Sequence, residues 1–379
     1  MEVYFDNSAT TIPYKEVINL VASAMENSYA NPSSAYKIGI DAEKEINKAR
    51  DFFAKSINCS REEIIFTSGG SESNNFAIKA FAKNGCNIVT TSIEHPSIIN
   101  TCKDIEADGV EVRYLDVDSN GRVNLEQLKK YIDKNTQLVS VMHVNNEMGI
   151  IQDLETIGSI VKEYGIRAKF HVDAVQSYGK FKIDVQKFKI DLLSVSSHKI
   201  HGPRGIGFSY LRKGLSARPL ICGGGQERGV RSGTENIAGI LGFAKAAEIV
   251  NYNLEKNYNN VGVVKDYFIN KLKEIDDITI NSPQSQDISN YILSVSFGGV
   301  KAEVLLHVLE ESEIYVSTGS ACSSKSGKDS YVLKSIGLKP EQIKGTTRFS
   351  FCENNTIEEA EYTISKLKEA LKFLRRLKI

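Results

Sequence analysis

Short apolar runs alternate with amphipathic segments along the chain up to about Ile249. Runs such as EEIIFT (62–67) and QLVSVMHV (137–144) are nearly continuous in apolar residues, which is typical of strands covered on both faces. Between them, LETIGSIVKEYG (154–165) carries apolar residues at helical spacing. Strands separated by helices predict an α/β domain with a mostly parallel sheet. The other predicted strands cover residues 87–92, 111–117, 168–174, 191–197 and 205–211.

The pattern changes after Ile249. The polar, Asn-rich segment NYNLEKNYNN (251–260) is predicted to be a linker. The remainder mixes the two periodicities, which predicts a smaller α+β C-terminal domain. Its expected helices cover 261–275, 301–312 and the chain from Ile357, and its expected strands cover 291–299 and 346–354.

Composition narrows the classes of function. Lys plus Arg and Asp plus Glu each number 47, and this balance gives no reason to expect a nucleic-acid or membrane partner. The six cysteines lie far apart, without a CxxC pair or zinc spacing. The opening MEVYFDNSATT lacks the features of a signal peptide, and no apolar run has the length of a transmembrane helix. We therefore expect a cytoplasmic protein with free thiols.

Two strand ends carry candidate ligand-binding residues. In FTSGGSESNNFAIKA (66–80), a Gly-Gly turn joins a strand to a helix that is predicted to begin near Ser71. Such a helix start can bind an anion, or Ser71 can be an ordinary N-cap. In FHVDAVQ (170–176), Asp173 ends a strand, where it either faces a ligand crevice or caps a helix.

A third strand end places a lysine beside polar neighbours. The stretch DLLSVSSHKIHGPRGIG (191–207) brings Ser196, His198 and Lys199 to the end of an apolar strand. Lys199 could act there as an amine nucleophile, although most lysines are solvated surface residues. A lysine together with an acidic partner such as Asp173 is what a pyridoxal phosphate site requires.

Two glycine-rich segments complete the set. CGGGQERGVRSGTEN (222–236) offers Arg228, Arg231 and Thr234 as donors to phosphate or carboxylate, or it is a flexible surface loop. STGSACSSKSGKDS (317–330) displays Cys322 among residues that cannot form a core. Its composition predicts a mobile, solvent-exposed loop, in which a displayed thiol is unusual.

Together these motifs closely resemble the NifS/IscS-type cysteine desulfurases, pyridoxal-phosphate enzymes of the class V aminotransferase family. The resemblance covers essentially the whole chain, in order. It rests on VYFDNSATT (3–11), NPSS (31–34), SGGSESNN, EHPSI (94–98), HVNNEMGIIQD (143–153), HVDAVQS, SSHKIHGPRGIG, GGGQERGVRSGTEN, STGSACSS and RFSF (348–351).

The resemblance implies the architecture of pyridoxal phosphate enzymes of fold type I and a homodimer. The large α/β domain that binds the cofactor would span 15–252. The small α+β domain would combine 1–14 with 253–379 and would carry the catalytic cysteine loop.

The resemblance also implies roles for single residues. Lys199 would carry pyridoxal 5'-phosphate as an internal aldimine, Asp173 would pair with the pyridine nitrogen, and Gln176 would bond the phenolic oxygen. His95 would stack on the ring and move protons, and Cys322 would be the sulfur-accepting nucleophile.

Phosphate and carboxylate groups would each have their own ligands. The implied phosphate ligands are Gly70, Ser71, Ser196, His198 and, from the other subunit, Thr234. Asn146, next to the cofactor, and Arg348 would bind the carboxylate of the substrate, for which the planar guanidinium of arginine is well suited.

The implied reaction converts L-cysteine to L-alanine and leaves a persulfide on Cys322. The segment 317–330 would then be a poorly ordered tether that carries the thiol from the substrate to an acceptor. The sulfur would then pass to an acceptor protein, either a tRNA-thiolation enzyme or an iron–sulfur scaffold. Lys325 and Lys328 could favour the Cys322 thiolate. We expect no metal site, apart from Cys322 as a transient iron–sulfur ligand. The chain ends soon after LRRL, whereas relatives that feed a scaffold usually continue, which keeps tRNA thiolation and other sulfur carriers open.

Three alternatives to the desulfurase remain: an aminotransferase, a selenocysteine lyase and a non-catalytic subunit that relays sulfur or serves as a scaffold. Loss of activity in Cys322→Ala would separate the first from a desulfurase, and a bound yellow chromophore would dismiss the last. The other histidines and cysteines, His201 and Cys352 among them, are expected to be structural.

Overall fold

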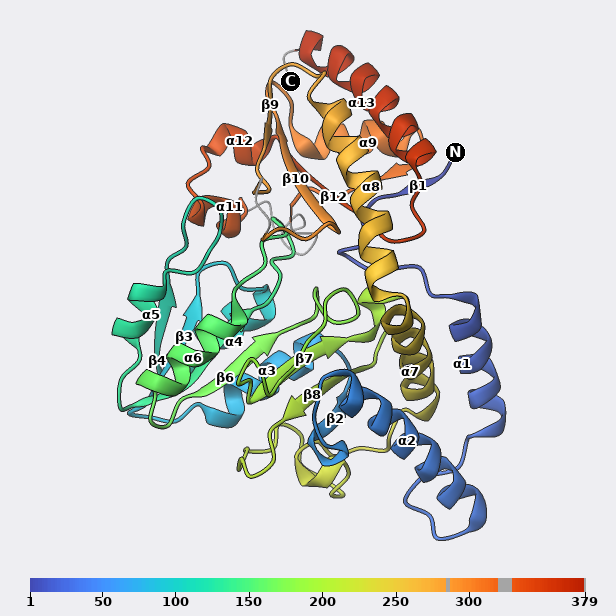
Figure 1. Cartoon of the computed structure of the whole chain (residues 1–379), viewed down its shortest axis with the longest axis vertical. Coiled ribbons are helices and arrows are strands. Elements are labelled where there is room, and N and C mark those ends of the chain that lie inside the picture. The colour runs from blue at the N-terminus through green and yellow to red at the C-terminus, as the bar shows by residue number, and fades with distance from the viewer. Residues whose placement is uncertain (284–286, 320–328, 378–379) are drawn as a thin grey trace.

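The computed structural model describes residues 1–283, 287–319 and 329–377. Its largest sheet has seven strands, seen in the lower half of Figure 1. In sheet order these are Ile64–Thr67 (β2), Gly207–Leu211 (β8), Leu192–Ser196 (β7), Lys169–Asp173 (β6), Thr136–Met142 (β5), Asn87–Thr91 (β3) and Glu111–Leu115 (β4). β7, β6, β5, β3 and β4 run parallel, and β8 is antiparallel to both β2 and β7. The mostly parallel sheet predicted from the sequence is therefore confirmed.

Helices cover both faces of this sheet, which explains why its strands are nearly continuous in apolar residues. On β5, Val139 and Val141 pack in one hydrophobic core, while Leu138 packs in another on the opposite face. The first core includes α2 (Lys37–Ser56), α5 (Leu125–Tyr131), α6 (Leu154–Tyr164) and α7 (Ile237–Tyr252). The second includes α3 (Gly70–Phe81) and α4 (Pro96–Ala107). The helix α1 (Lys15–Asn27) lies against α7.

A three-stranded antiparallel sheet forms a separate core, at the top of Figure 1. Its strands, in order, are Thr346–Ser350 (β12), Ile292–Phe297 (β10) and Ile278–Ile280 (β9). They pack with α8 (Leu254–Leu272), α9 (Ala302–Glu310) and α13 (Ile357–Leu377), and α13 lies against both of the other helices. Two short helices, α11 (Tyr331–Ser335) and α12 (Pro340–Lys344), precede β12. The α+β layout predicted for this part of the chain is confirmed.

The predicted linker at 251–260 is wrong, because helical structure runs through it. α7 ends at Tyr252 and α8 begins at Leu254, with only Asn253 between them. The polar composition misled the prediction, since several of these side chains have partners. Asn257 is buried, the Tyr258 ring meets the rings of Phe181 and Tyr291, and its carbonyl accepts a bond from Asn290.

The first residues of the chain belong to the separate core by their contacts. β1 (Val3–Tyr4) pairs in parallel with β11 (Ile314–Tyr315), and Val3 and Phe5 are buried in that core. The division into domains of 15–252 and of 1–14 with 253–379 remains our proposal. None of the described helices is both long enough and apolar enough to span a membrane.

His171 lies at the centre of the large sheet and is fully buried. Its ring nitrogens face the hydroxyls of Ser140 on β5 and Ser194 on β7 at 2.8 and 2.9 Å. Burial lowers the pKa of His171 to about 3. The unfolded chain therefore binds a proton near pH 6.5 that the folded chain does not, so folding stability is lost as the pH falls from there toward 3.

We predict that His171→Gln makes the free energy of unfolding less steeply dependent on pH. Between pH 6 and 5 the decline should be shallower than that of the native protein by about 1.4 kcal/mol per pH unit. Denaturant unfolding at several pH values measures this slope. His307→Gln is the matched control, because His307 is exposed on α9. Equal slopes for all three proteins would contradict the prediction.

Candidate active site

A cavity of about 470 Å³ opens where the carboxyl ends of the parallel strands meet the separate core. Asp173 ends β6 and Ser196 ends β7, so the sheet itself delivers both side chains to this edge. Ten of the residues predicted for the site line the cavity: Gly70, Ser71, His95, Asn146, Asp173, Gln176, Ser196, His198, Lys199 and Arg348. The chain thus gathers, in one place, residues that are up to 278 positions apart (348 minus 70).

Glycines shape the wall at the start of α3. Gly69 is the N-cap residue, and no side chain caps the helix, so the alternative of an ordinary Ser71 cap is wrong. A Cβ atom on Gly70 would lie 2.6 Å from Cγ2 of Val175. A Cβ atom on Gly207 would lie 2.3 Å from the Val195 carbonyl oxygen and 2.8 Å from Cα of Gly69. Glycine at these two positions therefore allows the close packing of this wall, and Gly70 and Ser71 of the first helical turn line the cavity.

Glu72, which lines this wall, forms an ion pair with Arg231. Arg231 donates to Glu72 at 2.8 Å, and the Ser68 N–H donates to the other oxygen of the same carboxylate. Although burial opposes it, these contacts hold the pKa of Glu72 below its ordinary value. Neither Arg231 nor Arg228 lines the cavity, so within one chain these arginines do not serve as its anion donors.

Asp173 is buried and firmly oriented. One carboxylate oxygen accepts from Nδ2 of Asn74 at 2.7 Å, and the other accepts from the Val175 N–H at 2.9 Å. The Asn74 amide also donates to Ser97, and its own oxygen is buried without a hydrogen-bond partner in the part of the chain that the structure describes. Asp173 caps none of the described helices, and its carboxylate lines the cavity.

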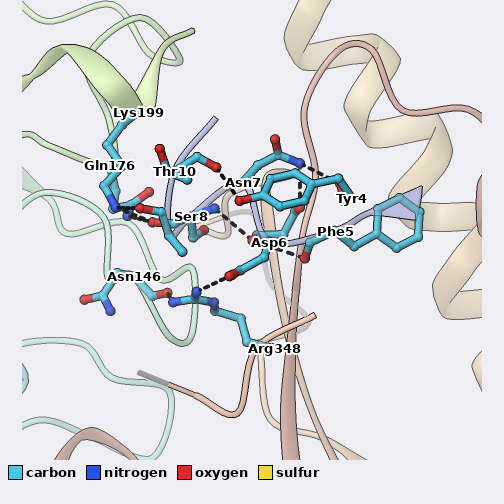
Figure 2. A network of polar contacts seen from close by, with 12 residues as sticks. Tyr4, Phe5, Asp6, Asn7, Ser8, Thr10, Asn146, Gln176, Lys199 and Arg348 are labelled. Atoms are coloured by element: carbon cyan, nitrogen blue, oxygen red, sulfur yellow. Dashed lines mark hydrogen bonds and ion pairs between the residues drawn. The ribbon is translucent and has the colours of Figure 1, made fainter. Parts of the chain in front are cut away.

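Lys199 is not a solvated surface lysine. It is half-buried at the end of the short turn Ser197–Lys199, and its Nζ donates to the carbonyl oxygens of Ser8 and Ala9. Figure 2 shows the amine reaching this stretch of chain, with Gln176 Nε2 donating to the same Ser8 carbonyl at 3.0 Å. We refer to residues 6–11 as the 6–11 turn.

His95 and His198 are both held neutral. The Ser97 N–H donates to Nδ1 of His95 at 3.1 Å, which leaves the proton of the neutral ring on Nε2. Burial lowers the pKa of His95, and the charge of Lys199 lowers it further, against the opposing effect of Asp173. Burial, Lys199 and Arg204 lower the pKa of His198 to about 3, and its Nδ1 lies 3.1 Å from the Thr10 hydroxyl.

Arg348 brings a fixed positive charge from β12. It is 2% exposed, and its Nη2 donates to Asp6 at 2.7 Å while its Nη1 donates to the Asn146 carbonyl at 2.9 Å. Figure 2 shows Asp6 and Asn146 on either side of the guanidinium. The Nε atom is buried without a hydrogen-bond partner among the described residues. A guanidinium with unused donors at a cavity wall can bind a carboxylate.

Of the remaining predicted residues, one lies away from the cavity and the other is outside the described part of the chain. Thr234 is exposed and does not line it, so its role in the site of a partner copy remains a prediction. Cys322, together with Lys325 and Lys328, lies outside the described residues, and the expectation of a poorly ordered tether is untested. The described flank is close to the site, since the Ser330 hydroxyl donates to the buried Glu147 at 2.6 Å.

Sequence reasoning missed the residues that hold the others in place. Asn74 orients Asp173, Asp6 orients Arg348, and the carbonyls of Ser8 and Ala9 receive Lys199. The segments VYFDNSATT and SGGSESNN contain all of them, but no spacing rule connects an asparagine in a helix to a carboxylate 99 positions away. Every residue type has a backbone carbonyl, so a hydrogen bond to a carbonyl cannot be predicted from residue types.

Comparisons with known proteins agree with this geometry. The class-V aminotransferase family model matches residues 3–363. The chain is 41% identical to the cysteine desulfurase IscS of Dictyoglomus turgidum, over 99% of this chain and 96% of that protein. It is 42% identical to the IscS of Methanosarcina thermophila, over 99% and 93%.

Two solved structures superpose closely on this chain over most of its length. A NifS-like protein superposes with a TM-score of 0.92 at 39% identity, covering 98% of this chain and all of the other. SspA in complex with cysteine superposes with a TM-score of 0.83 at 34% identity, covering 93% of this chain and all of the other. The fold is thus that of the NifS-like enzymes of fold type I.

If the cavity binds pyridoxal phosphate, as the resemblance implies, we predict that Gly70→Ala weakens this binding by about tenfold or more, because the new methyl group meets Val175 at the helix start. Titration of the cofactor-free protein with pyridoxal phosphate, followed by absorbance, measures the affinity. The double variant Gly70→Ala/Val175→Ala should recover most of the loss, since it removes the colliding Cγ2 atom. A loss in Gly70→Ala that the second substitution leaves unchanged would contradict this account of the wall.

Proposed function

We infer, from the premise that this chain belongs to the class-V aminotransferase family and is a cysteine desulfurase, that its cavity holds pyridoxal 5'-phosphate on Lys199 and delivers cysteine sulfur to Cys322. One observation carries the proposal: an amine, a buried carboxylate, two neutral imidazoles and a guanidinium converge on one cavity. The family and its desulfurase activity follow from the matches along nearly the whole chain.

The residues of the cavity fit this cofactor. The open helix start at Gly70 and Ser71, with the hydroxyl of Ser196 and the neutral His198, suits a phosphate. At the other side, Asp173 suits a protonated pyridine nitrogen, and the buried Asn74 oxygen has no hydrogen-bond partner among the described residues. Gln176 and His95 complete the lining. Bound there, the cofactor supplies an electron sink for the substrate carbon atoms.

The side chains of this protein then divide the work on L-cysteine. Arg348 and Asn146 would hold the substrate carboxylate, which fixes its orientation. The Lys199 amine, once free, would carry the proton of the substrate α-carbon, and the Nε2 side of His95 could move a second proton. The Ser8 and Ala9 carbonyls lie within reach of the lysine amine and would steady it as an ammonium ion.

The sulfur transfer itself belongs to Cys322. Its thiolate would attack the sulfur of the substrate, so that an S–S bond forms and the C–S bond breaks. The carbon that loses sulfur takes up a proton, and L-alanine leaves, while Cys322 retains the persulfide. Overall, L-cysteine and one thiol become L-alanine and one persulfide, with no external oxidant or reductant.

The partners follow from this chemistry as part of the proposal. The persulfide sulfur would pass to an acceptor protein, for tRNA thiolation or for iron–sulfur cluster assembly. A second copy of the chain would complete each site with Thr234, which is exposed in a single chain. The five described cysteines are free thiols, which is consistent with the proposed cytoplasmic setting.

Three single-residue variants test the proposal. Cys322→Ala should keep the yellow chromophore but lose about 100-fold or more of the alanine formed from L-cysteine. In the native protein, reduction with borohydride and peptide mass spectrometry should place the cofactor on Lys199, and Lys199→Ala should lose this adduct.

Cys222→Ala is the matched control, because this cysteine is exposed and lies away from the cavity. It should leave both the chromophore and the turnover unchanged. Full cysteine-to-alanine turnover in Cys322→Ala would refute the sulfur-transfer step, and an adduct on a different lysine would refute the assignment of Lys199.

A further inference from the structure

A histidine, a cysteine and a glutamate, which are all residue types that bind metal ions, lie close together outside the cavity described above. One donor atom from each of His201, Cys352 and Glu353 lies within 4.8 Å of the others. His201 and Cys352 are buried, and Glu353 is nearly so. His201 follows Lys199 by two residues, whereas the other two follow β12 of the separate core. The cluster therefore joins the two halves of the molecule.

The distances suit a tetrahedral ion. Nε2 of His201 lies 3.4 Å from Oε1 of Glu353. Two ligands bound to zinc at about 2.0–2.1 Å with tetrahedral angles are about 3.3 Å apart. A small cavity of about 10 Å³ is lined by all three residues and by Lys199, which leaves room for an ion but not for a larger ligand.

The surroundings orient the imidazole as metal sites do. Nδ1 of His201 donates to the Ile12 carbonyl at 2.7 Å, so that Nε2 is the nitrogen left for a ligand. The Tyr14 hydroxyl bonds Glu353, and its ring stacks on the His201 ring with centroids 4.5 Å apart. His201 also has a φ of 64°, a left-handed conformation that is unfavourable for a residue with a side chain. Its ring is thus held firmly in one place.

Charge and donor type favour a borderline soft cation. Although burial opposes it, contacts with Cys352 and Glu353 raise the pKa of His201 to about 10, so binding of a cation would release the proton of its Nε2. The thiolate, the carboxylate and the neutral imidazole would then balance a divalent ion, and this mixture of S, O and N donors is typical of zinc. Lys180 lines the same cavity, but its amine reaches Gln176 and lies over the Tyr291 ring. Among the described residues, no ion pair joins Lys180 to Glu353.

We propose that His201, Cys352 and Glu353 form a binding site for a divalent cation of the zinc type, which fastens the Lys199 segment to the end of β12. The site has three protein ligands and one open position, and it is separate from the proposed reaction. The expectation that His201 and Cys352 are merely structural is the competing account, in which His201 and Glu353 form an ion pair with nothing bound.

Zinc content of the holoenzyme tests the proposal. All proteins carry Cys322→Ser, so that this thiol cannot bind the metal, and each is stripped with a chelator and then titrated with zinc sulfate. The parent should bind close to one zinc ion per chain, and the ion should raise its melting temperature. Cys352→Ala and Glu353→Gln should each weaken zinc binding by about tenfold or more.

Cys102→Ala is the matched control, since Cys102 is also buried but belongs to no such cluster among the described residues. It should bind zinc as the parent does. Zinc-edge X-ray absorption of the parent needs no variant and should show one sulfur neighbour at about 2.3 Å with nitrogen and oxygen at about 2.0 Å. No bound zinc, equal binding in all variants, or a first shell without sulfur would overturn the proposal.

Discussion

The 6–11 turn is the constraint on which the site depends. Its backbone carbonyls at Ser8 and Ala9 receive the Lys199 amine from the large sheet. Its Asp6 side chain receives the Arg348 guanidinium from the separate core. Figure 2 shows these two cationic groups approaching the same short stretch of chain from different sides. Two groups of like charge are thus held near one cavity, each with oxygen partners that offset the cost of its desolvation.

The turn can do this because it is itself anchored on both sides. Asn7 donates to the carbonyls of Tyr4 and Ser350, and the Ser8 N–H donates to the Ser350 hydroxyl. A few residues on, the Thr11 N–H donates to the His198 carbonyl at 2.9 Å. Lys199 follows a strand of the large sheet, and Arg348 lies on a strand of the separate core. The distance between these two groups therefore depends on this connection. The cluster of His201, Cys352 and Glu353 would add a second connection between the same two parts.

The sequence predicted the parts of the fold that depend on local pattern. Continuous apolar strands and amphipathic helices identified the α/β sheet, because burial on both faces is visible in residue type. The residues of the cavity were identified by resemblance, since the pattern alone left Asp173 as a possible cap and Lys199 as a possible surface lysine. The structure decides both points through Asn74 and the Ser8 carbonyl.

What escaped prediction depends on contacts distant in sequence. The Asn-rich stretch at 251–260 has the composition of a linker, yet it is helical on both sides of Asn253, and Asn257 and Tyr258 find partners in the folded chain. The pairing of Asp6 with Arg348 spans 342 positions and involves a short segment without periodicity. Such features arise from tertiary structure, so the local propensities of the residues do not predict them.

The most direct test of the central role of the 6–11 turn is Asn7→Ala, which removes the anchor without touching a residue assigned to the reaction. Cofactor retained after dialysis reports on the Lys199 side, and the KM for L-cysteine reports on the Arg348 side. The account predicts that a folded variant loses cofactor and shows a raised KM together. A folded variant with native cofactor content and a native KM would contradict it.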